Sequence, residues 1–299
     1  MQRIISLVVL ILVSVSLVAS ANNDSALPSI TEIAYVRIKV SDLDTANDFY
    51  AGKLGLRSLR CAAENAKCYF VSPGQQVDLI KTDSPSTKDW IDAIGLYTAD
   101  VSGLRAYLYS NGQKPGELIT DSTGLVYFRI TDPEKHAIEF VQFRNSAGSV
   151  EPPLLHNLKM IHAGFVVSDR TVEDNFYKKL LGFKLYWSGG MKDGETDWVA
   201  MQTPGGTDWV EYMLNIPANA DKHLLGVMNH ISLGVPDVQA AAKKLEASGV
   251  TLGEQPKIGR DGKWQLNLYD PDFTRVELMG FTPAEKPCCS DFTGPHPKP

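Results

Sequence analysis

Four residues of the types that ligate metals stand at repeated positions in the C-terminal half of the chain. His162 and His230 each open a mostly apolar run, and Glu211 and Glu277 each lie inside another such run. A carboxylate on an apolar strand is costly to bury unless it is paired or bound to a metal. Two imidazoles and two carboxylates that converge make an N2O2 ligand set, which leaves positions open for water or substrate. We therefore expect one divalent ion (Zn, Ni, Fe or Mn) at these residues.

The alternative is that each His is a satisfied core residue and each Glu lies on a solvated edge of a sheet. For a single residue that alternative is the better interpretation, but four residues at repeat-equivalent places favour the metal. Glu211 and Glu277 are also the candidate catalytic residues, because a carboxylate beside a bound substrate can move a proton.

The elements that must position these residues repeat four times along the chain. Apolar runs that begin at residues 35, 93, 162 and 230 each end in an Asp seven residues later: Asp42, Asp100, Asp169 and Asp237. In the first and third units a Phe-Tyr pair (49–50, 176–177) and a Leu-Gly pair (54–55, 181–182) follow at matching offsets. The second and fourth units share Gly112 and Gly249 and the Asp-Pro pairs at 132–133 and 270–271. The order is A-B-A-B, and the Gly after each patterned segment indicates the end of an amphipathic helix.

Alternating runs follow each predicted helix, as at 125–130 and 264–269, and they predict strands joined by turns. Each unit is then a strand, a helix and about three strands. The predicted fold class is α+β, with four βαβββ units that form two domains. We place the first domain at 31–146, a linker at 147–156, the second domain at 157–284 and an irregular tail at 285–299.

The first domain has different residues at the four equivalent positions: Tyr35, Asp78, Ala93 and Glu139. None of them is a His, and the Ala93 side chain offers no ligand atom. We predict that this domain binds no metal and serves as a structural partner or a cover for the site.

The first 21 residues have the pattern of a secretory signal peptide. Arg3 precedes an uncharged apolar run over 4–18, and Ala19-Ser20-Ala21 fits the small-residue cleavage pattern. The run is shorter than the roughly 20 residues that span a bilayer, although an uncleaved anchor is the alternative. We expect cleavage near Ala21 and a secreted or periplasmic mature protein without a membrane segment. Nucleic-acid binding is not expected, because the net charge is −6 and no basic run occurs.

Several of these features occur together in a known family. They are the βαβββ unit, the Phe-Tyr and Leu-Gly-Phe residues within 176–183, the Asp-Pro and Val-Glu residues within 270–277, and the His-Glu-His-Glu set. In these features the chain resembles the vicinal oxygen chelate superfamily of glyoxalase I, extradiol dioxygenases, methylmalonyl-CoA epimerase and the fosfomycin and bleomycin resistance proteins. The resemblance covers about residues 31–284 and implies a tandem two-domain member with the metal in its second domain. It also implies that the two units of each domain pair into a curved mixed sheet that cups a site.

The resemblance implies two competing activities. The four-ligand set is similar to that of glyoxalase I, whereas the four-unit layout is similar to that of extradiol dioxygenases, whose triad would map to His162, His230 and Glu277. The dioxygenase pattern is broken where Asn267 stands in place of a Tyr and Phe273 in place of a Gly. We therefore favour a glyoxalase-like lyase or isomerase that acts on a small substrate through an enolate-like intermediate. The alternatives are an Fe(II) ring-cleaving dioxygenase and a non-catalytic resistance-type binding protein.

Four of the five tryptophans lie in the second domain, and they predict an apolar pocket for the substrate. The candidate pocket residues are Trp187, Trp198, Trp209 and Trp264, with Tyr186 and Tyr212 beside them and Arg260, Gln265 and Asn267 as polar contacts. Core packing is the alternative for each single aromatic residue. The pattern does not distinguish a monomer from a homodimer.

Cys61 and Cys68 flank a six-residue segment that has the pattern of a hairpin tip. Cross-strand neighbours pair readily in an oxidising compartment, so we predict a Cys61–Cys68 disulfide in the exported protein. Cys288 and Cys289 are adjacent in the tail, where a bond between neighbours would be strained, and free thiols are the alternative for all four. Mass spectrometry of non-reduced peptides tests the prediction, and free thiols at both 61 and 68 would contradict it.

Overall fold

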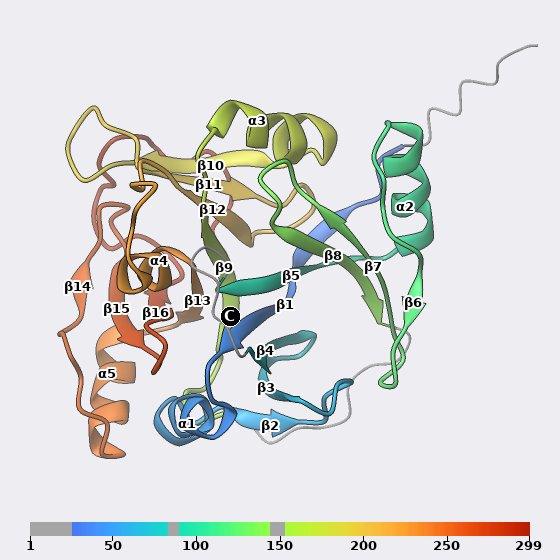
Figure 1. Ribbon diagram of the computed structural model, residues 1–299. Helices are drawn as coiled ribbons and strands as arrows, with labels where there is room; N and C mark the ends of the chain where they lie inside the picture. Colours follow the sequence, from blue (N-terminus) through green and yellow to red (C-terminus); the bar gives the residue numbers. More distant parts are fainter. Residues whose placement is uncertain (1–25, 83–89, 144–152) are drawn as a thin grey trace, which may run out of the picture.

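The chain forms two eight-stranded mixed sheets, each curved into a cup (Figure 1). This computed structural model describes residues 26–82, 90–143 and 153–299. The predicted signal peptide and most of the predicted linker, residues 147–152, lie outside the described residues. The predicted α+β class with two curved sheets is confirmed. Within the described part of the chain, no helix is both long enough and apolar enough to cross a membrane.

The first sheet contains two sequence units that meet at its centre. Its strands are β1 (Ile30–Val40), β2 (Arg57–Leu59), β3 (Ala66–Ser72), β4 (Gln75–Lys81), β5 (Ile91–Thr98), β6 (Ile119–Thr120), β7 (Leu125–Thr131) and β8 (Ala137–Phe143). Their order is β2-β3-β4-β1-β5-β8-β7-β6. β1 and β5 pair antiparallel in the middle, and each pairs parallel with the last strand of its own unit, β4 or β8.

The second sheet repeats this topology. Its strands are β9 (Lys159–Val166), β10 (Lys184–Gly189), β11 (Trp198–Gln202), β12 (Trp209–Met213), β13 (His230–Val235), β14 (Lys257–Ile258), β15 (Trp264–Tyr269) and β16 (Arg275–Gly280). Their order is β10-β11-β12-β9-β13-β16-β15-β14, with β9 and β13 antiparallel at the centre. The A-B-A-B pattern of the sequence therefore corresponds to two copies of one sheet.

Four helices begin at the repeated Asp residues. They are α1 (Leu43–Asn47), α2 (Val101–Ser110), α3 (Arg170–Asp174) and α5 (Val238–Ala247), and the preceding Asp carboxylate of each accepts backbone N–H groups of the first turn. α1 and α3 continue into the π-helical turns η1 (Asp48–Lys53) and η2 (Asn175–Leu180). Gly55 and Gly182 then have φ values of 66° and 73°, which Gly adopts without steric cost. The additional helix α4 (Lys222–Met228) precedes β13 and has no equivalent in the sequence repeat.

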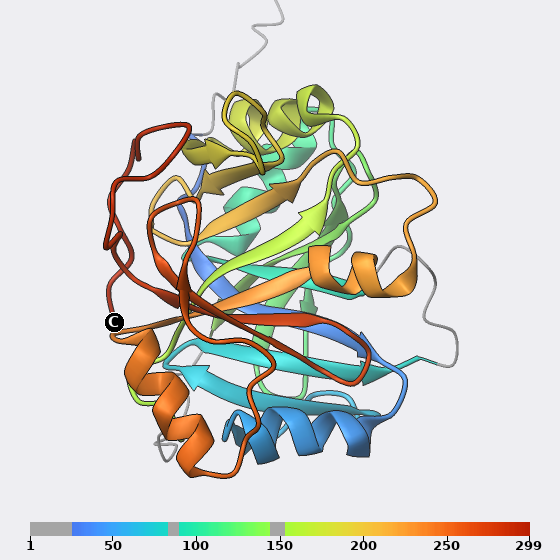
Figure 2. The same cartoon turned by 90° about the vertical axis from the view of Figure 1, so that its left-hand side faces the viewer.

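The repeated Phe-Tyr and Asp-Pro residues lie where the two domains meet. The Tyr50 hydroxyl donates to Asp270 Oδ2 at 3.1 Å, and the Tyr177 hydroxyl donates to Asp132 Oδ2, also at 3.1 Å. Each bond joins an A unit of one domain to the B unit of the other, so the domains are related by an approximate twofold axis. Figures 1 and 2 agree with this pairing, because α1 and α5 lie at one end of the molecule and α2 and α3 toward the other.

A second pair of equivalent residues joins the two central strands across this axis. The side chain of Gln75 accepts a hydrogen bond from the Met160 backbone at 2.8 Å, and Asp208 accepts one from the Ile33 backbone at 3.1 Å. Lys159 pairs with Asp208 at 3.1 Å. These buried contacts make the two sheets one packed unit.

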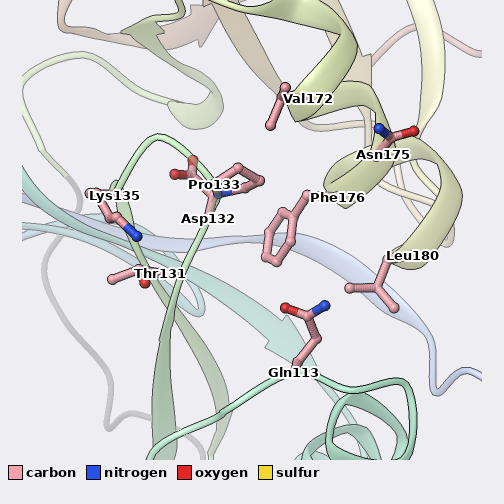
Figure 3. A pocket seen from close by; sticks show the side chains of 9 residues that line it. All are labelled: Gln113, Thr131, Asp132, Pro133, Lys135, Val172, Asn175, Phe176 and Leu180. Carbon is pink, nitrogen blue, oxygen red and sulfur yellow. The ribbon is translucent and has the colours of Figure 1, made fainter.

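A crevice lies where the turn between β7 and β8 meets α3 and η2 of the second domain (Figure 3). Asp132, Pro133 and Phe176 are among the residues that line it. Beside them, buried Glu173 accepts a hydrogen bond from the Glu134 backbone at 3.0 Å through Oε1, whereas its Oε2 has no hydrogen-bond partner in the described part of the chain. Burial and the neighbouring Asp132 carboxylate raise the pKa of Glu173 to about 8.

The cysteines form two disulfides. The predicted Cys61–Cys68 bond is confirmed. Cys288 and Cys289 are also bonded to each other, contrary to the expectation that strain would disfavour this pair. The tail that carries them has no helix or strand, yet it packs on the second sheet, where the Cys288 N–H donates to the Arg260 carbonyl at 2.9 Å.

We predict that Glu173→Gln stabilises the protein at pH 8.5 and has little effect at pH 5. The folded state raises the pKa of this acid, so ionisation lowers the free energy of unfolding as the pH rises from the ordinary range of a Glu through about 8. Gln cannot ionise and escapes this loss. Thermal unfolding at both pH values measures the difference.

The matched control is Glu246→Gln on the exposed face of α5, for which we expect no pH-dependent difference. An equal gain for Glu173→Gln at both pH values would show that the amide acts through packing and not through charge.

Candidate metal centre and pocket

The four predicted ligands lie on the four central strands of the second sheet, His162 on β9, His230 on β13, Glu211 on β12 and Glu277 on β16. The Nε2 atoms of the two imidazoles are 3.0 Å apart. Glu211 Oε2 lies 3.2 Å from Nε2 of His230 and 3.8 Å from Nε2 of His162. Glu277 Oε2 lies 3.3 Å from Nε2 of His162. One atom each of His162, Glu211 and His230 lies within 4.8 Å of the other two, so the structure brings the predicted set together.

The strand register explains this convergence. Gly164 on β9 is the cross-strand partner of both His230 and Glu211. A Cβ at Gly164 would lie 1.9 Å from Cε1 of His230, so only Gly lets that ring lie across the strand. His162, two residues before Gly164, points to the same face because side chains alternate along a strand.

Burial determines the protonation of these groups. Both imidazoles are fully buried, which lowers the pKa of His162 well below its usual value and that of His230 to about 3. Nδ1 of His230 lies 3.0 Å from the Met228 carbonyl oxygen, so Nδ1 carries the proton and Nε2 keeps its lone pair. Burial raises the pKa of Glu211 to about 7 and also raises that of Glu277.

These donors fit a divalent ion. Two neighbouring ligands at about 2.1 Å from an ion at right angles to one another lie about 3.0 Å apart. The closest contacts within the set, from 3.0 to 3.3 Å, are near this spacing. Neutral imidazole nitrogens and carboxylate oxygens are ligands for Zn, Ni, Fe and Mn alike. Nδ1 of His162 is buried and has no hydrogen-bond partner within residues 26–82, 90–143 and 153–299, so in this part of the chain the ring makes its polar contacts through Nε2.

The equivalent place in the first domain contains an ion-pair cluster. The Tyr35 hydroxyl donates to Glu139, and Arg37 binds the same carboxylate with two nitrogens at 3.1 and 3.0 Å. Arg129 adds a hydrogen bond at 2.9 Å. Burial acts to raise the pKa of Glu139, but Arg37 and the other donors outweigh it and the net shift is downward. A guanidinium thus supplies the positive charge in this domain.

Arg37 occupies the position in β1 that Gly164 occupies in β9. The register shows this, since Arg37 pairs with Ala93 and Gly164 pairs with His230. In both domains a residue with a large side chain is paired with a small residue on the neighbouring strand: Arg37 with Ala93, and His230 with Gly164. The comparison of the sequence repeats identified Ala93 as the position at which the first domain lacks a ligand. It did not identify the roles of Arg37 and Gly164, because these roles depend on which residues pair across two strands.

A pocket of about 380 Å³ adjoins the ligand set, and Glu211 and Glu277 form part of its wall. The predicted pocket residues that lie in this wall are Trp187, Trp198, Trp209, Arg260, Gln265 and Asn267, together with Tyr186. Trp264 and Tyr212 do not line the pocket but pack against the hydrophobic core. Each is adjacent in its strand to a wall residue, so the alternation of side chains turns it to the opposite face.

Sequence reasoning did not identify three further residues at the pocket. Arg275 lines the pocket. Its position two residues before Glu277 indicated this, because residues two apart on a strand point to the same face of the sheet. Phe292 closes one side from the tail. Lys263 is fully buried behind the wall, with Nζ 4.7 Å from the centre of the Trp209 ring. No sequence signal indicated Lys263, because Lys is rarely buried.

Lys263 also joins a short chain of hydrogen bonds. Its Nζ donates to the Tyr186 hydroxyl at 3.2 Å, and that hydroxyl lies 2.6 Å from Nδ1 of His296 in the tail. Burial lowers the pKa of Lys263 to about 8 and raises the pKa of the Tyr186 hydroxyl. The tail thus brings His296 next to the pocket residue Tyr186. The long separation of these two residues in the sequence did not suggest this contact.

Comparison with known proteins gives a family for the second domain and a fold for the chain. The model of the Glyoxalase/Bleomycin resistance protein/Dioxygenase superfamily matches residues 159–278. The Mn(II)-bound glyoxalase from Novosphingobium aromaticivorans is 20% identical, with a TM-score of 0.65 over 90% of this chain and 86% of that one. No curated protein sequence matches the chain.

Extradiol dioxygenases are similar to the same extent. An extradiol ring-cleaving dioxygenase from B. fuscum is 20% identical, with a TM-score of 0.64 over 91% of this chain and 76% of that one. A mutant of homoprotocatechuate 2,3-dioxygenase from Brevibacterium fuscum is 20% identical, with a TM-score of 0.63 over 86% and 73%. At this identity the likeness shows the two-domain fold and does not distinguish the two reactions.

We predict one divalent ion per chain, bound in the second domain only. An ion that binds the folded state alone raises the free energy of unfolding by about 2.7 kcal/mol at a hundredfold excess over Kd. His230→Ala should lose both the ion and this gain, because it removes a central ligand. Elemental analysis and thermal unfolding with added metal measure the two effects.

The control is Glu139→Gln at the equivalent position of the first domain, where we expect the metal content to stay unchanged. Two ions per chain, or an unchanged metal content in His230→Ala, would refute the assignment.

Proposed function

We propose that the protein is a metal-dependent enzyme, because its second domain (residues 159–278) matches the model of the Glyoxalase/Bleomycin resistance protein/Dioxygenase superfamily, also called the vicinal oxygen chelate superfamily. Its substrate is a small molecule that presents two neighbouring oxygen atoms. The observation that carries the proposal is the convergence of two neutral imidazoles and two buried carboxylates in the wall of a pocket. Burying carboxylates without a cation costs free energy, whereas a metal ion bound by them compensates their charge. Because the ligands border a cavity, the ion would be within reach of a bound substrate.

The reaction we propose is proton transfer next to a carbonyl group, as in a glyoxalase-like lyase or isomerase. A divalent ion bound by the four residues would supply Lewis acidity toward an oxygen of the substrate. Glu211 is the residue we assign as the base. Its side chain is 13% exposed against 4% for Glu277 and it faces the pocket, so it can reach a substrate proton. His162 and His230 stay neutral and hold their positions through burial.

Asn267 favours this reaction over oxygen insertion. It is the cross-strand neighbour of Glu277, and its side-chain amide donates to Glu254 Oε1 at 2.6 Å. An amide does not take up or release protons near neutral pH. The position that the dioxygenase resemblance would give to an acid or base is therefore occupied by a group without that chemistry.

A ring-cleaving dioxygenase is the second candidate, and one observation favours it. Tyr186 lines the pocket and is hydrogen-bonded to His296 and Lys263. These three titratable side chains form a hydrogen-bonded chain that offers a route for a proton into or out of the pocket. The route lies on a side of the pocket other than that of Asn267.

We also propose that the protein acts after export, in a periplasmic or extracellular compartment. The signal-peptide pattern of the first 21 residues supports this location. The two disulfides support it as well, because such bonds persist in oxidising compartments.

We expect the metal-loaded protein in D2O to exchange the proton next to the carbonyl of α-hydroxy-ketones. Glu211→Gln should slow this exchange by a factor of about 10² to 10⁴, the usual contribution of a general base. The metal should stay bound, because three ligands are unchanged. Proton NMR measures the exchange, and elemental analysis measures the metal content.

Oxygen uptake separates the candidate functions. Stoichiometric uptake by Fe(II)-loaded protein with catechols, with ring-opened product, would promote the dioxygenase. Tight binding of these compounds without exchange, uptake or product would indicate a binding protein. Glu139→Gln serves as the control in each assay, and we expect it to behave as the wild-type protein.

A further inference from the structure

Arg275 is a cation of the pocket wall that has no ion-pair partner among the described residues. It lies two residues before Glu277 on β16, so both side chains point to the same face of the sheet. The pocket is lined by both residues. In the part of the chain that the structure describes, the buried Nε–H of Arg275 has no hydrogen-bond acceptor, and the guanidinium forms no ion pair.

Two other cations of the pocket wall each pair with a carboxylate. Lys257 pairs with Glu254 at 2.8 Å. Arg260 forms an ion pair with Asp193 at the rim. Lys263, behind the wall, donates a hydrogen bond to the Tyr186 hydroxyl at 3.2 Å.

The charge balance changes when the proposed metal binds. Without an ion, the carboxylates of Glu277, two residues along β16, and of Glu211, in the same pocket wall, offset the charge of Arg275 at a distance. A divalent ion needs both glutamates to neutralise its own charge. Arg275 is then left with a positive charge in a partly buried wall, and such a charge is costly unless a counter-ion occupies the pocket.

We propose that Arg275 is the binding site for a carboxylate of the substrate, and that the substrate is therefore a monoanion. This inference rests on the proposed function, because it is the metal that takes up the charge of the two glutamates. A guanidinium binds a carboxylate through two parallel hydrogen bonds, which suits a single planar anion. A doubly charged phosphate would overcompensate one cation, so the carboxylate is the better match.

The pocket walls indicate the rest of the substrate. Residues two apart on a strand are about 6.6 Å apart, so the carboxylate lies roughly one ring length from the oxygens that bind the metal. Trp187 and Trp198 stand in the wall with their rings stacked at 6.5 Å, and Trp209 lies in the same wall, paired across strands with His162. A flat apolar body with two neighbouring oxygens at one end and a carboxylate at the other fits these surroundings.

Two probes that differ only in a carboxylate test the subsite. Catechol and 3,4-dihydroxybenzoate offer the same two neighbouring oxygens, and only the second has the acid group. With the full Zn(II)-loaded protein, calorimetry or tryptophan quenching should give a Kd at least about tenfold lower for 3,4-dihydroxybenzoate, as expected for hydrogen bonds between charged groups. Zinc is redox-inert, so the assay reports binding without turnover.

Arg275→Gln should lose this preference while keeping its zinc and its affinity for catechol. Arg275→Lys should keep part of this preference, because the positive charge is retained whereas the pair of parallel N–H groups of the guanidinium is lost. The matched control is Arg105→Gln in the first domain, which removes an arginine that is paired with Glu117 at 2.9 Å and does not line the pocket, and it should leave the preference intact.

The two possible failures look different. Catechol binding that depends on zinc but shows no preference for the carboxylate, or a preference that survives in Arg275→Gln, overturns the subsite and leaves the metal-dependent function standing. Absence of any zinc-dependent catechol binding contradicts the metal centre and the subsite together.

Discussion

Glu211 and Glu277 place two carboxylates inside the central strands of a sheet, where charge is poorly solvated. Burial raises the pKa of both carboxyl groups and keeps His162 and His230 neutral, so none of the four side chains supplies a positive charge to the others. A cation satisfies all of them at once. The other features of the site depend on this condition: Gly164 makes room for one imidazole, and the Met228 carbonyl fixes its tautomer.

The first domain meets the same condition with a different cation. Its remaining carboxylate, Glu139, is held by Arg37 and Arg129, and Tyr35 replaces a ligand imidazole. The guanidinium comes from the strand position that is Gly164 in the second domain. The centre of such a sheet can thus hold either a metal-ligand set or an arginine side chain. The two exclude one another, because a side chain at the position of Gly164 would occupy the space of the His230 ring. In the second domain that space adjoins a pocket.

The pocket also depends on parts of the chain outside the repeat. The tail supplies Phe292 to its wall and brings His296 to Tyr186. Lys263 lies behind the same wall, against Trp209. The domain interface, by contrast, uses the repeated motifs themselves, since a Tyr of each A unit binds an Asp of the opposite B unit.

The sequence by itself determined the features that depend on local order and period. The four repeats, the Asp-capped helices, the Cys61–Cys68 pair and the candidate ligand positions follow from spacing, because a helix or strand fixes which face each residue takes. Only the tertiary structure decided which residues of different strands meet. Trp264 belongs to the core and Arg275 to the pocket, Arg37 and Gly164 are counterparts, and the tail reaches Tyr186. These facts depend on strand register and on packing across the sheet, and neither is encoded in the spacing of one segment.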